Sequence, residues 1–137
     1  MRAEHAALAK VKLSGQSKRN GELDHLEGLL DDGEQVVTMA DAIFRSEGAE
    51  RRGLAVLTDR RLLCVDKDAI NRDLLAIGIS GITSMVIDSS GGMGDARRGA
   101  LTIVADEVET ALTRINPWER AAEIRASVIE ASKVPAL

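Results

Sequence analysis

Two neighbouring arginines, Arg97 and Arg98, lie in a glycine-rich stretch that runs from Gly91 to Gly99. A guanidinium group binds phosphate or carboxylate oxygens through paired N–H groups, so this stretch can hold an anion. It lacks the Gly-Lys-Ser/Thr ending of a phosphate-binding loop and the third glycine of a dinucleotide fingerprint. We therefore interpret it as a hairpin loop in which the two arginines are candidate anion-binding residues.

No set of residues in the chain matches a catalytic or metal-binding pattern. The histidines His5 and His25 form no recognisable catalytic motif with the single cysteine, Cys64, and we find no nucleophile with a suitably spaced base. The acidic residues between positions 31 and 34 do not follow the alternating ligand spacing of a calcium loop. The sequence predicts a protein that is not an enzyme, with no catalytic residues, no metal and no cofactor.

The composition argues against nucleic acid as a partner and against a membrane-spanning or secreted protein. The 137 residues fit one domain, and 18 basic against 22 acidic residues give a net charge of −4, which argues against a nucleic-acid coat. Phe44 and Trp118 are the only aromatic residues, too few for base-stacking platforms. The chain has no apolar run long enough for a membrane span and no secretory signal, and a lone cysteine suits a reducing compartment. We expect a cytoplasmic protein.

The first twenty residues differ electrically from the rest. Five basic residues against one acidic residue give them a net charge of +4, which leaves −8 for residues 21 to 137. Alanines between positions 3 and 9 allow a weak helix, and residues 14 to 17 have the composition of a linker. We predict that residues 1–19 form a basic, flexible arm that folding does not need.

The elements that position these residues follow from hydrophobic periodicity. Leucines at helical spacing after Asn20, a capping residue, predict a helix over 20–31, and Gly33 suits its left-handed stop. Residues 35–115 then show strand character with short connections, which favours antiparallel neighbours. We predict seven strands, over 35–44, 53–58, 61–66, 74–79, 82–87, 100–105 and 108–115.

The last predicted element is a helix over 117–132, signalled by Asn116 as its cap, Pro117 at its first position and Glu119 three residues after the cap. Helical spacing places Trp118 on the apolar face. Arg125 falls within the same apolar stripe. We expect either that its aliphatic stem lies along the apolar surface with the guanidinium group in solvent, or that the guanidinium group pairs with a carboxylate.

The turn Thr58-Asp59-Arg60-Arg61 has a physical rationale of its own. Thr58 and Asp59 can accept hydrogen bonds from nearby backbone amides, and the two arginines then point to different sides as the next strand begins. The motif is therefore expected to set strand register rather than to bind a ligand.

The segment from Leu54 to Asp66, Leu-Ala-Val-Leu-Thr-Asp-Arg-Arg-Leu-Leu-Cys-Val-Asp, resembles the second hairpin of bacterial pleckstrin-homology (PH)-like domains. Short patterns at 30–34, 82–86 and 99–103 and the closing helix follow that family's order. The resemblance implies a mainly β (α+β) fold: a seven-stranded antiparallel barrel capped by a C-terminal α-helix, preceded by an N-terminal helix and the basic arm. The PH-like domain would then span 20–137.

The resemblance also implies a function in binding. PH-like barrels often act as scaffolds, so we expect an interaction module that works through self-assembly, as a homo-oligomer, or through a partner-protein interface. The alternative is peripheral binding of an anionic lipid surface, because eukaryotic PH relatives hold lipid headgroups near the loop after the first strand. That loop carries Arg45, Arg51 and Arg52 here, although Glu47 and Glu50 offset part of the charge.

Overall fold

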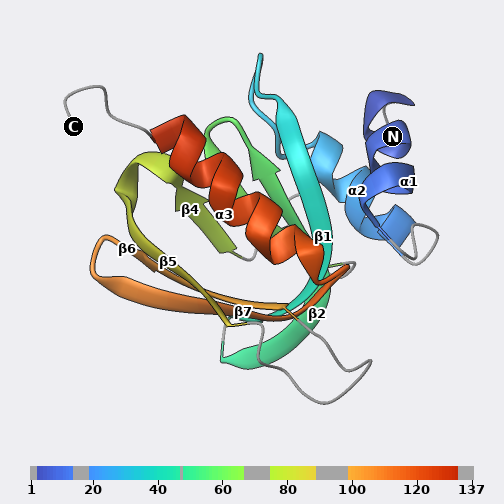
Figure 1. Cartoon of the computed structure of the whole chain (residues 1–137). Coiled ribbons are helices and arrows are strands. Elements are labelled where there is room, and N and C mark those ends of the chain that lie inside the picture. The colour runs from blue at the N-terminus through green and yellow to red at the C-terminus, as the bar shows by residue number, and fades with distance from the viewer. Residues whose placement is uncertain (1–2, 14–18, 47, 67–74, 89–98, 133–137) are drawn as a thin grey trace.

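The computed structural model describes residues 3–13, 19–46, 48–66, 75–88 and 99–132. Within them, seven antiparallel strands form one bent sheet in the order β4-β3-β2-β1-β7-β6-β5, and three α-helices pack against it (Figure 1). The elements are α1 Ala3–Lys12, α2 Asn20–Glu27, β1 Val36–Ser46, β2 Ala49–Thr58, β3 Arg61–Val65, β4 Leu75–Gly78, the 3-10 helix η2 Ile79–Gly81, β5 Ile82–Asp88, β6 Gly99–Ala105, β7 Val108–Asn116 and α3 Glu119–Ser132.

The main core lies inside the bend of the sheet. Strand β1 pairs with both β2 and β7, so it joins the β1–β4 layer to the β5–β7 layer, and α3 lies across the opening between them (Figure 1). Phe44, Leu62, Leu101 and Ile124 are among the fully or almost fully buried side chains that fill this space. The predicted seven antiparallel strands and the C-terminal helix are confirmed.

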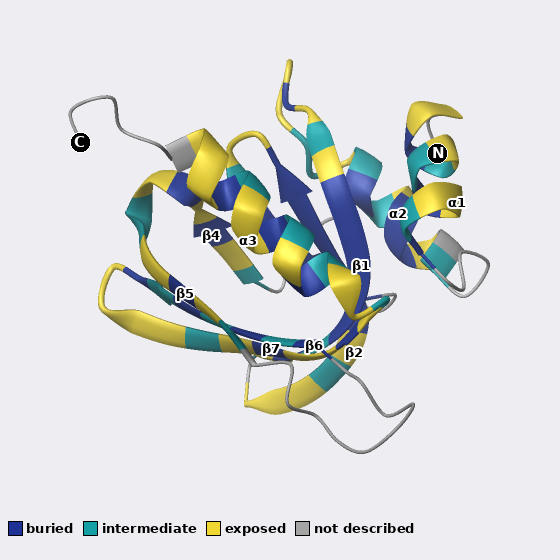
Figure 2. Ribbon diagram, in the orientation of Figure 1, coloured by how far each residue is buried: buried dark blue, intermediate teal, exposed yellow. Residues whose placement is uncertain are grey.

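Strands β1, β2 and β3 are buried on both faces. Their side chains alternate between the main core and a second cluster on the outer face, where α1 and α2 cover them (Figure 2). The second cluster contains Ala9, Leu13, Leu23, Leu26, Met39, Leu54, Val56, Leu63 and Val65. Cys64 points into the main core with no exposed surface, as expected for a small buried hydrophobe, and burial raises the pKa of its thiol.

The N-terminal segment differs from the predicted flexible arm. Helix α1 buries Ala9 completely and leaves Leu13 only 6% exposed. Sequence composition suggested that these residues could not offset the entropy of ordering them, but that estimate left out the apolar outer face of β1–β3, which α1 covers. Residues 14–18 lie outside the described residues.

Polar contacts attach α1 to two other helices. His5 Nδ1 lies 2.8 Å from Glu27 Oε1 of α2. At the other end, Lys12 pairs with Glu123 of α3, and Arg120 Nε donates to the Lys12 carbonyl oxygen over 3.0 Å. Thr38 of β1 also donates to Glu123. These contacts join the first helix, the first strand and the last helix.

Two helix boundaries differ from the predictions. Helix α2 ends at Glu27, so it stops before the predicted end at 31, and Gly33 has its positive φ in the following turn. Helix α3 begins at Glu119, because Asn116 still belongs to β7. The predicted inward face of Trp118 is wrong, since its side chain precedes the helix and is 37% exposed. The buried stripe of α3 is formed by Ala121, Ile124 and Val128.

The hydrogen bonds of the Thr58–Arg61 turn form as predicted, but the prediction that Arg60 and Arg61 point to different sides is wrong, since both guanidinium groups lie within 4.0 Å of Asp31 Oδ2. Thr58 Oγ1 accepts the backbone N–H groups of Arg60 and Arg61, each over 3.0 Å, and Asp59 Oδ1 accepts that of Gln35. Thr58 also donates to Glu34 Oε2 over 2.6 Å. Hydrogen bonds from Arg61, then from Thr58 and the Asp31 amide, outweigh desolvation and lower the pKa of Glu34 to about 2. This polar cluster ties the segment before β1 to the β2–β3 turn.

Candidate functional site

The arginines predicted to bind anions lie in strands rather than in a long loop. Residues 46 and 49 form the last pair of the β1–β2 hairpin, and Arg52 is opposite Ile43. Alternation along β2 puts Arg51 on the face of the main core, whereas Arg45 and Arg52 are on the outer face. The structure therefore does not bring the three guanidinium groups together on one face.

Local partners also reduce the charge of this hairpin. Arg51 Nη1 lies 3.0 Å from Asp66 Oδ2, and Arg45 is paired in register with Glu50. Arg45 Nη1 donates to the Gly48 carbonyl over a long 3.4 Å. The other candidates, Arg97 and Arg98, lie outside the described residues, so the hairpin is the part of the predicted anion site that can be placed.

A groove lies elsewhere on the molecule, between strand β5 and helix α3. It has a volume of about 420 Å³ and is lined by Ile82, Thr83, Ser84, Met85, Val86, Arg125, Val128 and Ile129. Val86 is 58% exposed and Ile129 48%, which are high values for large apolar side chains. The groove therefore offers apolar surface from a strand on one side and a helix on the other.

Strand β5 is an edge of the sheet. In the described part of the chain it pairs only with β6, through residues from Ile82–Ala105 to Asp88–Ala100. An edge strand presents N–H and C=O groups that can pair with another extended chain. The groove therefore combines a hydrogen-bonding edge with an apolar wall.

Arg125 supplies the positive charge of this groove. Its Nε atom donates to the Met85 carbonyl oxygen over 2.9 Å, and none of the groove-lining residues is acidic. The sequence predicted that Arg125 would extend to solvent or find a carboxylate, whereas its recorded bond is to the backbone of the neighbouring strand. This bond holds the guanidinium group beside β5.

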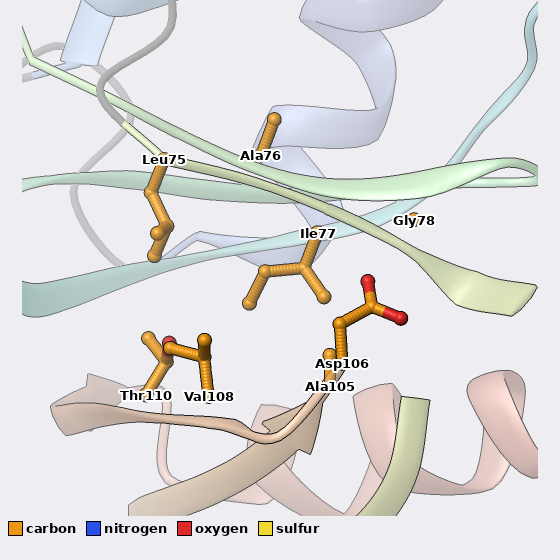
Figure 3. Close-up of a pocket in the computed structure, with 8 residues that line it drawn as sticks. All are labelled: Leu75, Ala76, Ile77, Gly78, Ala105, Asp106, Val108 and Thr110. Carbon is orange, nitrogen blue, oxygen red and sulfur yellow. The ribbon is translucent and has the colours of Figure 1, made fainter. Parts of the chain in front are cut away.

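A second, smaller pocket of about 250 Å³ lies where the two layers separate, between β4 and the β6–β7 hairpin. Figure 3 shows Leu75 and Ile77 on one side facing Val108 and Thr110 on the other, with Asp106 at the rim. Its polar groups are few, so it offers little that would orient a ligand. In the described residues no cluster of His, Cys, Asp and Glu is placed to hold a metal ion.

Comparisons with known proteins identify the fold. No protein-family profile matches the chain, and no curated protein matches it significantly in sequence. Among solved structures it is similar to the Vps36 N-terminal PH domain, with 14% identity and a TM-score of 0.57 over 80% of this chain and 87% of that one. The C-terminal PH domain of human pleckstrin gives 15% identity and a TM-score of 0.56, with 77% and 87% covered.

A bacterial structure is similar to the same extent. The DUF1696 family protein with a pleckstrin-homology domain from Shewanella loihica has 17% identity and a TM-score of 0.54, over 81% of this chain and 91% of that one. At these identities the similarity establishes a PH-like fold and does not identify a binding partner. None of the described helices is long and apolar enough to cross a membrane.

The sequence predicted the strand and the helix that line the groove, but it did not predict that they lie side by side. It predicted a strand over 82–87 and singled out Arg125 as a charge within an apolar stripe. Nothing local in the sequence indicates that β5 lies at the edge of the sheet, because strand order depends on long-range pairing. Ile129 is exposed beside the buried stripe of α3, and helical spacing alone does not locate the margin of such a stripe.

Proposed function

We propose that this protein is a non-enzymatic interaction module that binds an extended segment of a partner protein along β5. The single observation that carries the proposal is that β5, within the described residues, pairs with one strand only and lies beside a groove formed with α3. Added strands gain affinity from main-chain hydrogen bonds and specificity from pockets for alternate side chains. The groove supplies both features.

The charge of the groove defines the partner segment further. Arg125 is the one charged residue among those that line the groove, so a carboxylate in the bound segment would be complementary to it. The apolar wall formed with Ile129 accommodates an aliphatic or aromatic side chain. The expected partner segment is therefore extended, apolar at one position and acidic near it.

The test is selection from a displayed library of random twelve-residue peptides, followed by NMR mapping of the selected peptides on the labelled protein. We expect backbone amides of β5 to shift most, and selected sequences to be enriched in acidic and apolar residues. Ile129→Lys should weaken binding about tenfold or more by placing a charge in the groove. The control Val11→Lys changes an exposed apolar helix residue outside the groove, 70% exposed against 48% for Ile129, and should leave affinity unchanged.

The alternative is binding of anionic lipid headgroups through Arg45, Arg51 and Arg52. A specific observation favours it: Arg45 and Arg52 are exposed at the hairpin. Vesicles with and without phosphatidylserine, at two salt concentrations, separate the two proposals, because lipid binding by arginines weakens steeply with salt. Salt-sensitive vesicle binding that a triple alanine variant abolishes, together with no peptide-induced shifts in β5, would replace the peptide proposal by the lipid one.

A further inference from the structure

The strand register determines which backbone groups of β6 are used by β7. The loop between these two strands has two residues, Asp106 and Glu107, so the residues on either side of it exchange backbone hydrogen bonds. Bonded and non-bonded pairs alternate along an antiparallel ladder. Counted back from the loop, Ile103 and Leu101 therefore also direct their N–H and C=O groups towards β7.

Met85 and Ile87 of β5 consequently direct their backbone groups away from β6. They are paired in register with Ile103 and Leu101, and both residues of a non-bonded pair turn their N–H and C=O groups outwards. The hydrogen bond from Arg125 Nε to the Met85 carbonyl oxygen agrees with this direction, because Arg125 belongs to α3. A strand added to β5 would form its backbone hydrogen bonds with Met85 and Ile87.

Arg125 already occupies one of these backbone positions. Its Nε atom donates to the Met85 carbonyl oxygen over 2.9 Å. The backbone N–H of an added strand would donate to the same oxygen from the same side, with N and O also about 2.9 Å apart. The guanidinium group and an added strand therefore compete for this carbonyl. Arg125 is an exposed residue, so its side chain can turn away from β5 into solvent.

The register also identifies the side chain of an added strand that lies nearest to Arg125. Directly opposite residues have their side chains on the same face of a sheet. The Met85 side chain is part of the main core, on the face that α3 covers. The side chain of the bound residue opposite Met85 therefore points towards α3, beside Arg125.

The next side chain on this face lies beside Ile129. Helix α3 and strand β5 run in opposite directions, so Ile129, which follows Arg125 by one turn, lies towards the first residues of β5 (Figure 1). Along a strand, residues two positions apart point to the same face. In an antiparallel added strand, the residue beside Ile129 therefore follows the residue opposite Met85 by two positions.

We propose, resting on the proposed function, that Arg125 is a displaceable cap on the edge of β5 and selects an acidic segment. In the free protein its guanidinium group binds the Met85 carbonyl. When a strand binds, a backbone N–H takes this carbonyl, and the guanidinium group pairs with a carboxylate on the bound residue opposite Met85. A segment without that carboxylate leaves Arg125 with solvent alone and binds more weakly. The selected segment is antiparallel to β5, with an acidic residue followed two positions later by an apolar one.

The test uses NMR titration of the isotope-labelled full chain with two nine-residue peptides whose ends are capped. The first peptide is Lys-Thr-Val-Thr-Glu-Thr-Leu-Thr-Lys, and the second has Gln in place of Glu. We expect the parent to bind the Glu peptide about tenfold more tightly than the Gln peptide at about 0.15 M salt. This comparison needs no variant, so it does not depend on whether a variant folds.

Two variants then assign the preference to one side chain. Arg125→Met retains an apolar stem of similar length and should bind the two peptides equally. Arg52→Met, which changes an exposed arginine of β2 outside the groove, is the control and should keep the parent's preference. In the parent, the Nε–H signal of Arg125 should shift when the Glu peptide binds, because its acceptor changes from a carbonyl oxygen to a carboxylate.

The outcomes separate this inference from the proposed function. Shifts of β5 amides with equal affinity for the two peptides, or with an unchanged Arg125 signal, overturn the inference and leave the proposed function standing. The inference alone also fails if neither peptide shifts β5 while peptides selected from the library do. No β5 shift with either the two peptides or the selected ones overturns the proposed function itself.

Discussion

Arg61 binds Glu34 through two parallel hydrogen bonds, from Nε to Oε2 and from Nη2 to Oε1, each 2.9 Å long. The Glu34 side chain has no exposed surface in this pair. Arg61 Nη2 also donates to the Leu29 carbonyl oxygen over 2.8 Å. One side chain at the start of β3 therefore holds two points of the segment that connects α2 to β1, Leu29 and Glu34.

Arg61→Met is expected to destabilise the fold by about 3 kcal/mol, because it leaves a buried carboxylate without its cationic partner. The matched control is Arg60→Met, since the Arg60 side chain is 48% exposed and its ion pair with Asp31 is long at 4.0 Å. That change should cost no more than about 0.5 kcal/mol. Urea unfolding of the two variants measures both, and equal losses would contradict the assigned role of Arg61.

Lowering the pH should reduce the stability of the folded protein, because Glu34 loses its charge. Its pKa is about 2 in the folded protein against an ordinary value of 4.5, so the unfolded chain takes up the proton first as pH falls. The stabilisation is complete above about pH 4.5 and is lost progressively towards pH 2. Glu123, whose pKa is also lowered, acts in the same direction.

The free energy of unfolding, measured by urea titration in steps from about pH 6 to pH 2.5, should decrease with acid. Glu34→Gln removes one of the groups that take up a proton, so the free energy of unfolding should decrease less steeply with falling pH than in the parent. A slope identical to the parent's would contradict the lowered pKa of Glu34.

Removal of residues 1–13 is expected to lower the thermal midpoint by about 5 °C or more, because it exposes part of the second apolar cluster. This outcome reverses the expectation from sequence alone. Ala9→Asp should reproduce the loss by placing a charge at a fully buried site, whereas Val11→Asp changes a residue that is 70% exposed and should be nearly neutral. An unchanged midpoint after truncation would show that α1 contributes nothing to stability.

Glu107→Gly should stabilise the protein by about 1 kcal/mol. Asp106 and Glu107 connect β6 to β7 and have φ values of 51° and 69°, the left-handed conformation that a two-residue hairpin of type I′ requires. A side chain at such a position costs about 1 kcal/mol relative to glycine. Differential scanning calorimetry measures the gain, and Glu109→Gly in the neighbouring strand, where glycine is unfavourable, is the control with the opposite sign.

The predicted strands and the C-terminal helix agree with the structure because their signals are local. Alternating apolar residues and short polar turns define antiparallel neighbours, and Thr58 with Asp59 forms its turn through bonds within a few residues and to Gln35. Errors occurred where burial depends on distant residues. Trp118 was placed inward by helical spacing, but the chain enters the helix only after it, and α1 was judged too weak without the sheet face that it covers.

Sequence alone determined the class of the fold, the number of strands and the residues available for binding, since periodicity and turn chemistry act over short stretches of chain. Tertiary structure alone decided that β5 is an edge, that Arg125 lies against it and that Arg51 is separated from Arg45 and Arg52 by the plane of a strand pair. The physical reason is that strand order and the covering of each face are set by long-range apolar contacts. Those contacts form between segments that are far apart in the chain, and the local sequence of one segment does not indicate which other segment it will contact.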